Sequence, residues 1–191
     1  MGLDVRCRCG QVRGVLEASA IHARVSCYCR DCQAWARWLG TPDLLDECGG
    51  TDVVVITPGL LRFQSGQEQV ACATLSGKVL RWYAACCRTP LANTGARARP
   101  VFATLAAGTM DSLRLGEVAG PPARAVAHQR SATAPVRATP MALARAVAGT
   151  AIGLLGAKLR RQQHSPFFDA ASGEPLRVPQ PISAPRTETA P

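Results

Sequence analysis

Three cysteines lie within six positions of the segment VSCYCRDCQAW, in the pattern C-x-C-x-x-C: Cys27, Cys29 and Cys32. Zinc prefers thiolate and imidazole ligands in tetrahedral geometry, and short cysteine spacings supply two ligands from one turn. Residues two apart on a strand share a face, so Cys27 and Cys29 can point at one ion, and the turn through Arg30 and Asp31 brings Cys32 to the same point. The pattern favours metal binding over buried thiols or a redox dithiol, because a redox C-x-x-C usually opens a helix in a βαβ unit and the sequence predicts no such unit here.

A second pair of cysteines, Cys7 and Cys9, lies in the segment CRCG, where Gly10 permits a tight turn. We expect this pair on one face of a strand. Two ligands cannot close a structural metal site, and the natural source of further ligands is the distant pair Cys86 and Cys87. Neighbouring side chains on a strand point to opposite faces, so both could reach one ion only from a turn.

The remaining candidates for metal ligands have no partner at ligand spacing. Cys72 lies in a predicted strand and is interpreted as a small buried hydrophobic residue, while Cys48 lies in a Gly-rich loop. The three histidines, His22, His128 and His164, belong to no ligand motif.

Composition limits the class of protein. The chain has 191 residues, of which 47% are hydrophobic and 5% aromatic, which suits one domain with a mostly aliphatic and alanine core and an extension. The net charge is +9, but no basic block is interleaved with aromatic residues, so nucleic acid is not an expected partner. The start of the chain has no apolar segment typical of a secretory signal, and we expect a cytoplasmic protein whose cysteines are reduced.

The elements that must position the first cysteines are mainly strands. β-Branched runs and polar–apolar alternation predict strands at 51–57, 61–65, 69–75 and 78–84. A short helix is predicted at 31–39. The expected fold class is therefore mainly β.

All nine cysteines lie between Cys7 and Cys87, and the later part of the chain is rich in Ala, Pro and Arg. We therefore predict a zinc-binding β domain over residues 1–118 and a basic extension over 119–191, with a disordered tail over 178–191. The extension holds one predicted helix near 140–161; its apolar part, residues 141–157, is short of the roughly 20 residues of a membrane span and contains Arg145, so no membrane span is expected. Its capping residues are Thr139 and Pro140, and its apolar residues recur every four positions at Leu143, Val147, Ala151, Leu155 and Leu159.

Three ordered motifs, CRCGQV, CYCRDC and CCRTPLANT, resemble the family of glutathione-dependent formaldehyde-activating enzymes and centromere protein V. The resemblance covers about residues 5–105. It implies an antiparallel β-tent fold with two zinc ions: a structural site from the first and third motifs, and a catalytic or ligand-binding site from the middle motif. The chain departs from the third motif, because Ala84 stands where the family has its first cysteine and Arg88 where it has glycine. Cys86 is then the candidate to replace the lost ligand.

Three thiolates leave one tetrahedral position open, which is typical of a site that takes a ligand. With the resemblance, this predicts a zinc-dependent carbon–sulfur lyase acting on a small thiol adduct such as S-(hydroxymethyl)glutathione. The alternatives are a non-catalytic zinc domain that binds a partner or an anionic ligand, and a purely structural zinc module. Arg30, Arg37 and Arg81 are candidates, by position, to bind carboxylates of a peptide thiol. No catalytic residue, substrate or oligomeric state is assigned.

Overall fold

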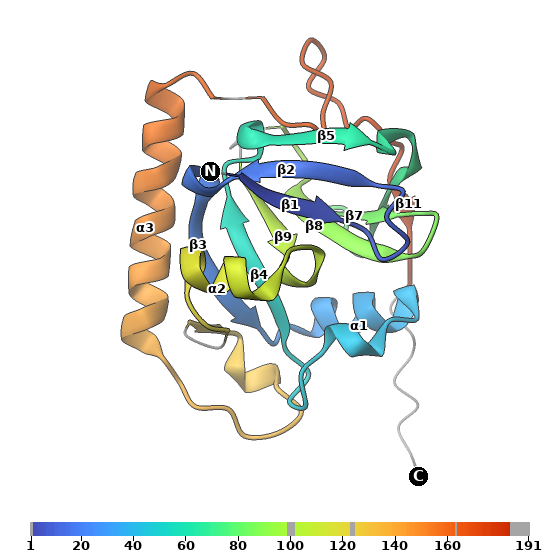
Figure 1. Ribbon diagram of the computed structural model, residues 1–191. Coiled ribbons are helices and arrows are strands. Elements are labelled where there is room, and N and C mark those ends of the chain that lie inside the picture. Colours follow the sequence, from blue (N-terminus) through green and yellow to red (C-terminus); the bar gives the residue numbers. More distant parts are fainter. Residues whose placement is uncertain (1, 99–101, 123–124, 163, 184–191) are drawn as a thin grey trace.

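The computed structural model describes residues 2–98, 102–122, 125–162 and 164–183 (Figure 1). The strands are β1 Gly2–Arg6, β2 Arg13–Glu17, β3 Ile21–Cys27, β4 Thr51–Ile56, β5 Leu61–Ser65, β6 Val70–Thr74, β7 Val79–Ala84, β8 Thr89–Gly95, β9 Ala103–Ala106, β10 Val126–Ala127 and β11 Gln180–Pro181. The α-helices are α1 Arg30–Leu39, α2 Ser112–Ala119 and α3 Pro140–Leu159. Short 3-10 helices are η1 Ala18–Ala20, η2 Pro42–Leu44, η3 Pro58–Leu60, η4 Gln67–Gln69, η5 Ala107–Thr109 and η6 Gln129–Ser131.

The strands form two sheets, one in the order β1-β2-β5 and one in the order β10-β3-β4-β9-β8-β7-β6-β11. Neighbouring strands are antiparallel, except that β10 joins β3 and β11 joins β6 in parallel. The predicted mainly β fold with a helix in the extension is confirmed, and the four predicted strands correspond to β4, β5, β6 and β7.

One main core joins the two sheets. Leu16 and Leu61 from the small sheet are buried together with Val54, Leu105 and Trp82 from the large one. Leu16 and Leu61 alternate along β2 and β5 with more exposed side chains, as expected for a sheet with one face in a core. The core fixes how the turns that carry the cysteines lie relative to one another.

Helix α3 runs along β3 at the edge of the molecule (Figure 1). It begins at Pro140, as its capping residues predict. Small residues face β3: a Cβ added at Gly149 would touch the backbone of His22, and one added at Gly153 would overlap the His22 ring. The apolar residues that recur every four positions lie largely outward instead, with Val147, Leu155 and Leu159 mainly exposed.

Within the described residues, α3 is the one helix whose length and apolar composition would suffice to cross a membrane. It packs on β3 and β10, and only a small share of its apolar stretch is buried. The expectation that this helix does not span a membrane stays a prediction.

Residues beyond the predicted boundary at 118 contribute to the fold. Phe167 and Phe168 are buried in the main core, where their rings lie 5.1 and 6.1 Å from that of Trp82. Ile182 is also buried, directly after β11. The tail predicted to be disordered begins at residue 178, so β11 and Ile182 fall within it; residues 184–191 lie outside the described residues. The division into two domains stays a prediction.

Candidate metal centres and the adjoining pocket

Cys27, Cys29 and Cys32 form one group of thiols, here called the three-cysteine cluster, and their sulfurs lie within 4.8 Å of one another. The Sγ atom of Cys32 is 2.9 Å from that of Cys29 and 4.0 Å from that of Cys27. Sulfurs around a tetrahedral zinc ion are about 3.8 Å apart, given a Zn–S bond of about 2.3 Å. The cluster is therefore close to the arrangement in which three thiolates could share one metal ion.

The local fold of this cluster differs from the prediction. Cys27 ends β3, but Cys29 lies outside the strand as the N-cap of α1, and its sulfur accepts a hydrogen bond from the backbone N–H of Cys32. The C-x-x-C segment thus opens a helix. The strands on either side of that helix, β3 and β4, are antiparallel, so the unit is not the βαβ crossover typical of redox dithiols.

The thiols of this cluster differ in pKa. Hydrogen bonds from Cys27 and Cys29 lower the pKa of Cys32, and the nearby charge of Arg81 lowers it further. Hydrogen bonding with Cys29 and Cys32 raises the pKa of Cys27, and burial adds to this effect. The cluster therefore holds one thiolate readily, while a second and third need a cation to balance their charge.

A four-cysteine cluster is formed by two turns that are remote in sequence. Cys9 and Cys86 lie 3.3 Å apart between their sulfurs, Cys7 and Cys9 3.5 Å, Cys7 and Cys86 3.9 Å, and Cys86 and Cys87 3.8 Å. All four sulfurs lie within 4.8 Å of one another. These spacings also suit a tetrahedral zinc ion, and here four thiols are present.

The turns explain how all four sulfurs converge. Cys7 and Cys9 follow β1 rather than lying on it, so the expectation of a shared strand face is wrong for this pair. Cys86 and Cys87 lie in the turn that joins β7 to β8, where neighbouring side chains can point the same way. The turn ends at Arg88 with φ of 56°, a left-handed conformation that favours glycine.

Burial raises the pKa of the Cys7 thiol. Burial also opposes ionisation of Cys87, but hydrogen bonds from the Thr89 hydroxyl and the Cys9 backbone outweigh it and lower its pKa to about 6. This cluster too has one thiol that ionises easily, Cys87, beside Cys7 and Cys86, whose pKa values burial raises.

Arg88 links the two clusters through α1. Its guanidinium donates hydrogen bonds to the carbonyls of Leu39, at 2.9 Å, and Trp38, at the end of α1. It also lies 4.9 Å from the centre of the Trp38 ring. Because α1 begins at the three-cysteine cluster and Arg88 follows Cys87 directly, the helix spans from one cluster to the other.

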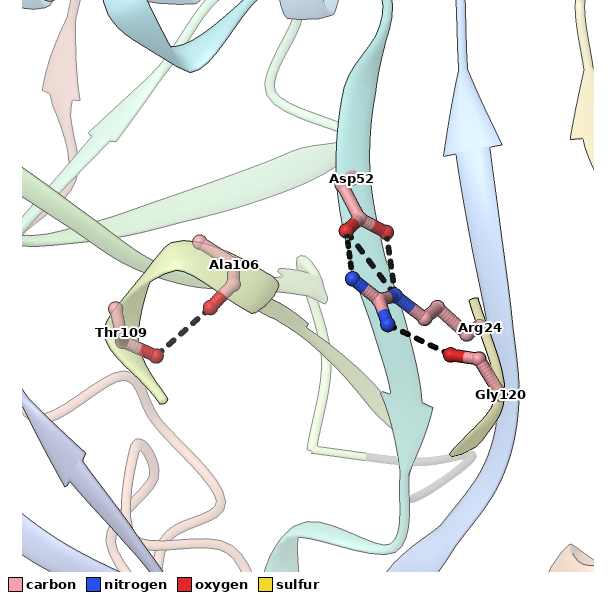
Figure 2. Close-up of polar contacts among 5 residues, drawn as sticks. All are labelled: Arg24, Asp52, Ala106, Thr109 and Gly120. Atoms are coloured by element: carbon pink, nitrogen blue, oxygen red, sulfur yellow. Dashed lines mark hydrogen bonds and ion pairs between the residues drawn. The ribbon is translucent and has the colours of Figure 1, made fainter. Parts of the chain in front are cut away.

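A pocket of about 250 Å³ adjoins the three-cysteine cluster. Cys32 and Trp35 of α1 line it, together with Arg81 of β7 and Asn93 of β8, which are paired across the sheet. Asp52 also lines this pocket, and its carboxylate is held by Arg24 at 2.6 Å (Figure 2). Arg24 in turn donates to the carbonyl of Gly120. A ligand in this pocket would lie next to Cys32.

The structure separates the three arginines predicted as carboxylate ligands. Arg81 is 4% exposed and lines the pocket, whereas Arg30 and Arg37 are exposed on α1. The roles of Asn93 beside the pocket and of Arg88 at the end of α1 are not predictable from the sequence. Nothing local in the sequence indicates which strand or helix end these two residues face. Strand register brings Asn93 to Arg81.

Residues predicted to be outside the metal sites are outside both clusters. Cys72 is buried in the core, and Cys48 lies in the loop before β4. His22 bonds the Thr57 hydroxyl at 2.8 Å, and His128 and His164 are exposed. The structure describes all nine cysteines, and each is a free thiol.

Comparison with known proteins gives a family but no activity. Residues 2–175 match a family of unknown function, DUF6151. The chain belongs to this family. None of the curated proteins matches the sequence. A crystal structure of a Rhodobacter sphaeroides protein is similar at 18% identity, over 61% of this chain and 97% of that chain, with a TM-score of 0.42. Function must therefore be inferred from the site itself.

Proposed function

We propose that this protein binds two zinc ions, and that the three-cysteine cluster is the site at which a small thiol binds. The observation that carries the proposal is the difference between the clusters. Four thiols can fill a tetrahedral ion, whereas three leave one position open, and the three lie beside a pocket.

The donor groups fit zinc. Both clusters consist of cysteines alone, and soft thiolate ligands in tetrahedral arrangement select zinc or iron–sulfur centres over hard cations. When bound at the three-cysteine cluster, zinc would supply an open position that holds the sulfur of an incoming thiol as thiolate. The reduced thiols of the clusters suit the cytoplasm, which is the compartment we propose.

The reaction we propose is the addition of a thiol to formaldehyde and its reverse, as the resemblance to the formaldehyde-activating family implies. The thiol sulfur forms a bond to the carbonyl carbon, and the thiol proton ends on the carbonyl oxygen. The reverse step breaks the carbon–sulfur bond and returns both reactants, so no oxidant or further co-reactant is needed. The residues of this chain hold the ligand thiol near Cys32 and offer the charge of Arg81 beside it. Glutathione is one thiol of the proposed class.

A second candidate function is favoured by the charge of the site. Arg6, Arg8 and Arg13 line a neighbouring pocket beside the four-cysteine cluster. A non-catalytic zinc domain would use these arginines to bind an anionic ligand, and no bond would break.

The test uses full-length protein loaded with Co²⁺ in place of zinc, whose thiolate absorption reports ligand binding. Titration with 2-mercaptoethanol should change the spectrum of the wild type and of Cys48→Ser, the control outside both clusters. Cys29→Ser should lose this response. Exchange of formaldehyde with the thiol adduct, followed by NMR, should be faster with the zinc-loaded wild type than with Cys29→Ser. Thiol binding with no faster exchange would favour the non-catalytic function, and no thiol binding would refute both the open site and the lyase.

A further inference from the structure

Helix α3 carries an apolar stripe on the side that faces away from β3 (Figure 1). The stripe consists of four side chains that are 59–76% exposed: Met141, Ile152, Leu155 and Leu159. At about 100° per residue, these four fall within about 60° around the helix axis, and Ala157, the buried residue of the helix, falls on the opposite side. Large apolar side chains gathered on one open surface are typical of a binding surface.

The charge around this apolar stripe has a single sign. Between Glu117 and Asp169 the sequence contains seven basic residues and no acidic one. Four of the basic residues lie in α3 or directly after it and are exposed: Arg145, Lys158, Arg160 and Arg161. In the part of the chain that the structure describes, the ion pair joins Arg24 to Asp52, so the cations of α3 have no carboxylate partner there. The surface therefore suits a partner that is both apolar and negatively charged.

A membrane that contains anionic lipids offers both properties, with negative headgroups above a hydrocarbon layer. The long aliphatic parts of Arg145 and Lys158 allow their charges to reach the headgroups while the apolar stripe lies deeper. A second copy of the chain fits less well, because two such helices would bring cations against cations. A nucleic acid would attract the cations but would leave the apolar stripe in water.

The flanks of α3 favour a helix that lies on the membrane rather than one that crosses it. Before the helix, β10 is part of the large sheet, and shortly after it Phe167 packs against Trp82 of the same sheet. A helix of 20 residues is about 30 Å long, which is about the thickness of the hydrocarbon layer. A helix that crossed the bilayer would place these two attachments to one sheet on opposite sides.

We propose that α3 binds the surface of an anionic membrane, with its apolar stripe at the boundary between headgroups and hydrocarbon and its cations against the lipid headgroups. The apolar stripe is short, so the affinity depends on apolar contact and charge together. A basic residue near an anionic surface contributes roughly fivefold to the affinity. This inference concerns a surface remote from the thiol pocket and does not depend on the proposed zinc chemistry.

The test is sedimentation of the full-length protein with vesicles of phosphatidylcholine, either alone or mixed with phosphatidylglycerol. The wild type should bind the mixed vesicles, bind phosphatidylcholine alone far less, and be released by high salt. Ile152→Gln with Leu155→Gln should weaken binding about tenfold or more. Arg160→Gln with Arg161→Gln should weaken it by roughly fivefold for each charge removed. The matched control is Val178→Gln, an exposed apolar position beside β11 at the other edge of the large sheet, which should bind like the wild type.

The changed positions are exposed, so the variants should keep the Tm of the wild type; if the Ile152 and Leu155 variant does not fold, the arginine variant decides. No binding to the mixed vesicles, or equal binding with and without phosphatidylglycerol, would overturn the proposal. Wild-type binding by the variants would also refute it. Protein that high salt does not release would be inserted across the bilayer, against the surface location. Sedimentation velocity without vesicles tests the remaining occupant: a dimer that Ile152→Gln with Leu155→Gln dissociates would assign the apolar stripe to a second copy instead.

Discussion

At the scale of single residues, the two cysteine clusters differ in the length of chain that they close. Cys9 and Cys86 are 77 residues apart, whereas Cys29 and Cys32 are three apart. Bringing distant residues together costs more chain entropy in the absence of a link, so a metal that joins them should stabilise the fold more. We therefore expect the four-cysteine cluster to matter for folding and the three-cysteine cluster for ligand binding.

The first prediction compares Cys9→Ser with Cys29→Ser. By analogy with a disulfide that closes a loop of this size, Cys9→Ser should cost roughly 4 kcal/mol, or about 10 °C in Tm. Cys29→Ser should cost much less, because serine also serves well as an N-cap for α1. Thermal unfolding of the zinc-loaded proteins measures both, with Cys48→Ser as control. A larger loss of Tm in Cys29→Ser would reverse the assignment of the two sites.

The cysteines could be predicted from sequence because their residue type and short spacing are local signals. The convergence of Cys86 and Cys87 needed only one condition, a turn, and the structure has one. The partners of Arg81 and Arg88 could not be predicted, since they depend on strand register and on where α1 ends.

At the scale of elements, α3 shows how a helix can be predicted while its packed face is not. The helix is apolar around its whole circumference, so periodicity does not choose a side. Close approach to β3 requires small residues, and Gly149 and Gly153 provide it. The larger apolar residues, such as Leu155, are left outward. Helix α2 was not predicted because it is only eight residues long and contains Gly116.

The second prediction concerns this close approach. Gly153→Ala would place a methyl group in the His22 ring, which is held by Thr57, so α3 should shift from β3 and the Tm should fall. Gly156→Ala has open space and should gain up to about 1 kcal/mol of helix propensity. Thermal unfolding of the pair measures this contrast. Equal stabilisation by both changes would show that α3 does not pack on β3 through Gly153.

At the scale of the whole molecule, the chain beyond residue 118 packs against the main core and the large sheet in several places. Phe167 packs against Trp82 and Phe63, and β11 extends the large sheet. The family match likewise runs to residue 175. Composition changes near residue 120 could not reveal these contacts, because they join segments about a hundred residues apart.

The third prediction is that this part of the chain stabilises the core. Phe167 is 1% exposed, and Phe167→Ala should cost about 3–5 kcal/mol through lost burial and the cavity left behind. Val178→Ala, at a residue 92% exposed, should change stability by less than about 0.5 kcal/mol. Urea unfolding of the zinc-loaded variants measures both. A small effect at Phe167 would mean that the β domain is stable without the extension.

The central claim is that two separate cysteine clusters each hold zinc, and metal content per chain tests it most directly. Elemental analysis of reduced, full-length protein should find about two zinc ions per chain, and about one in both Cys29→Ser and Cys86→Ser. Cys48→Ser should keep both ions. Wild-type protein that carries no zinc, or iron alone, would contradict the account, and an unchanged zinc count in Cys86→Ser would remove Cys86 from the ligands.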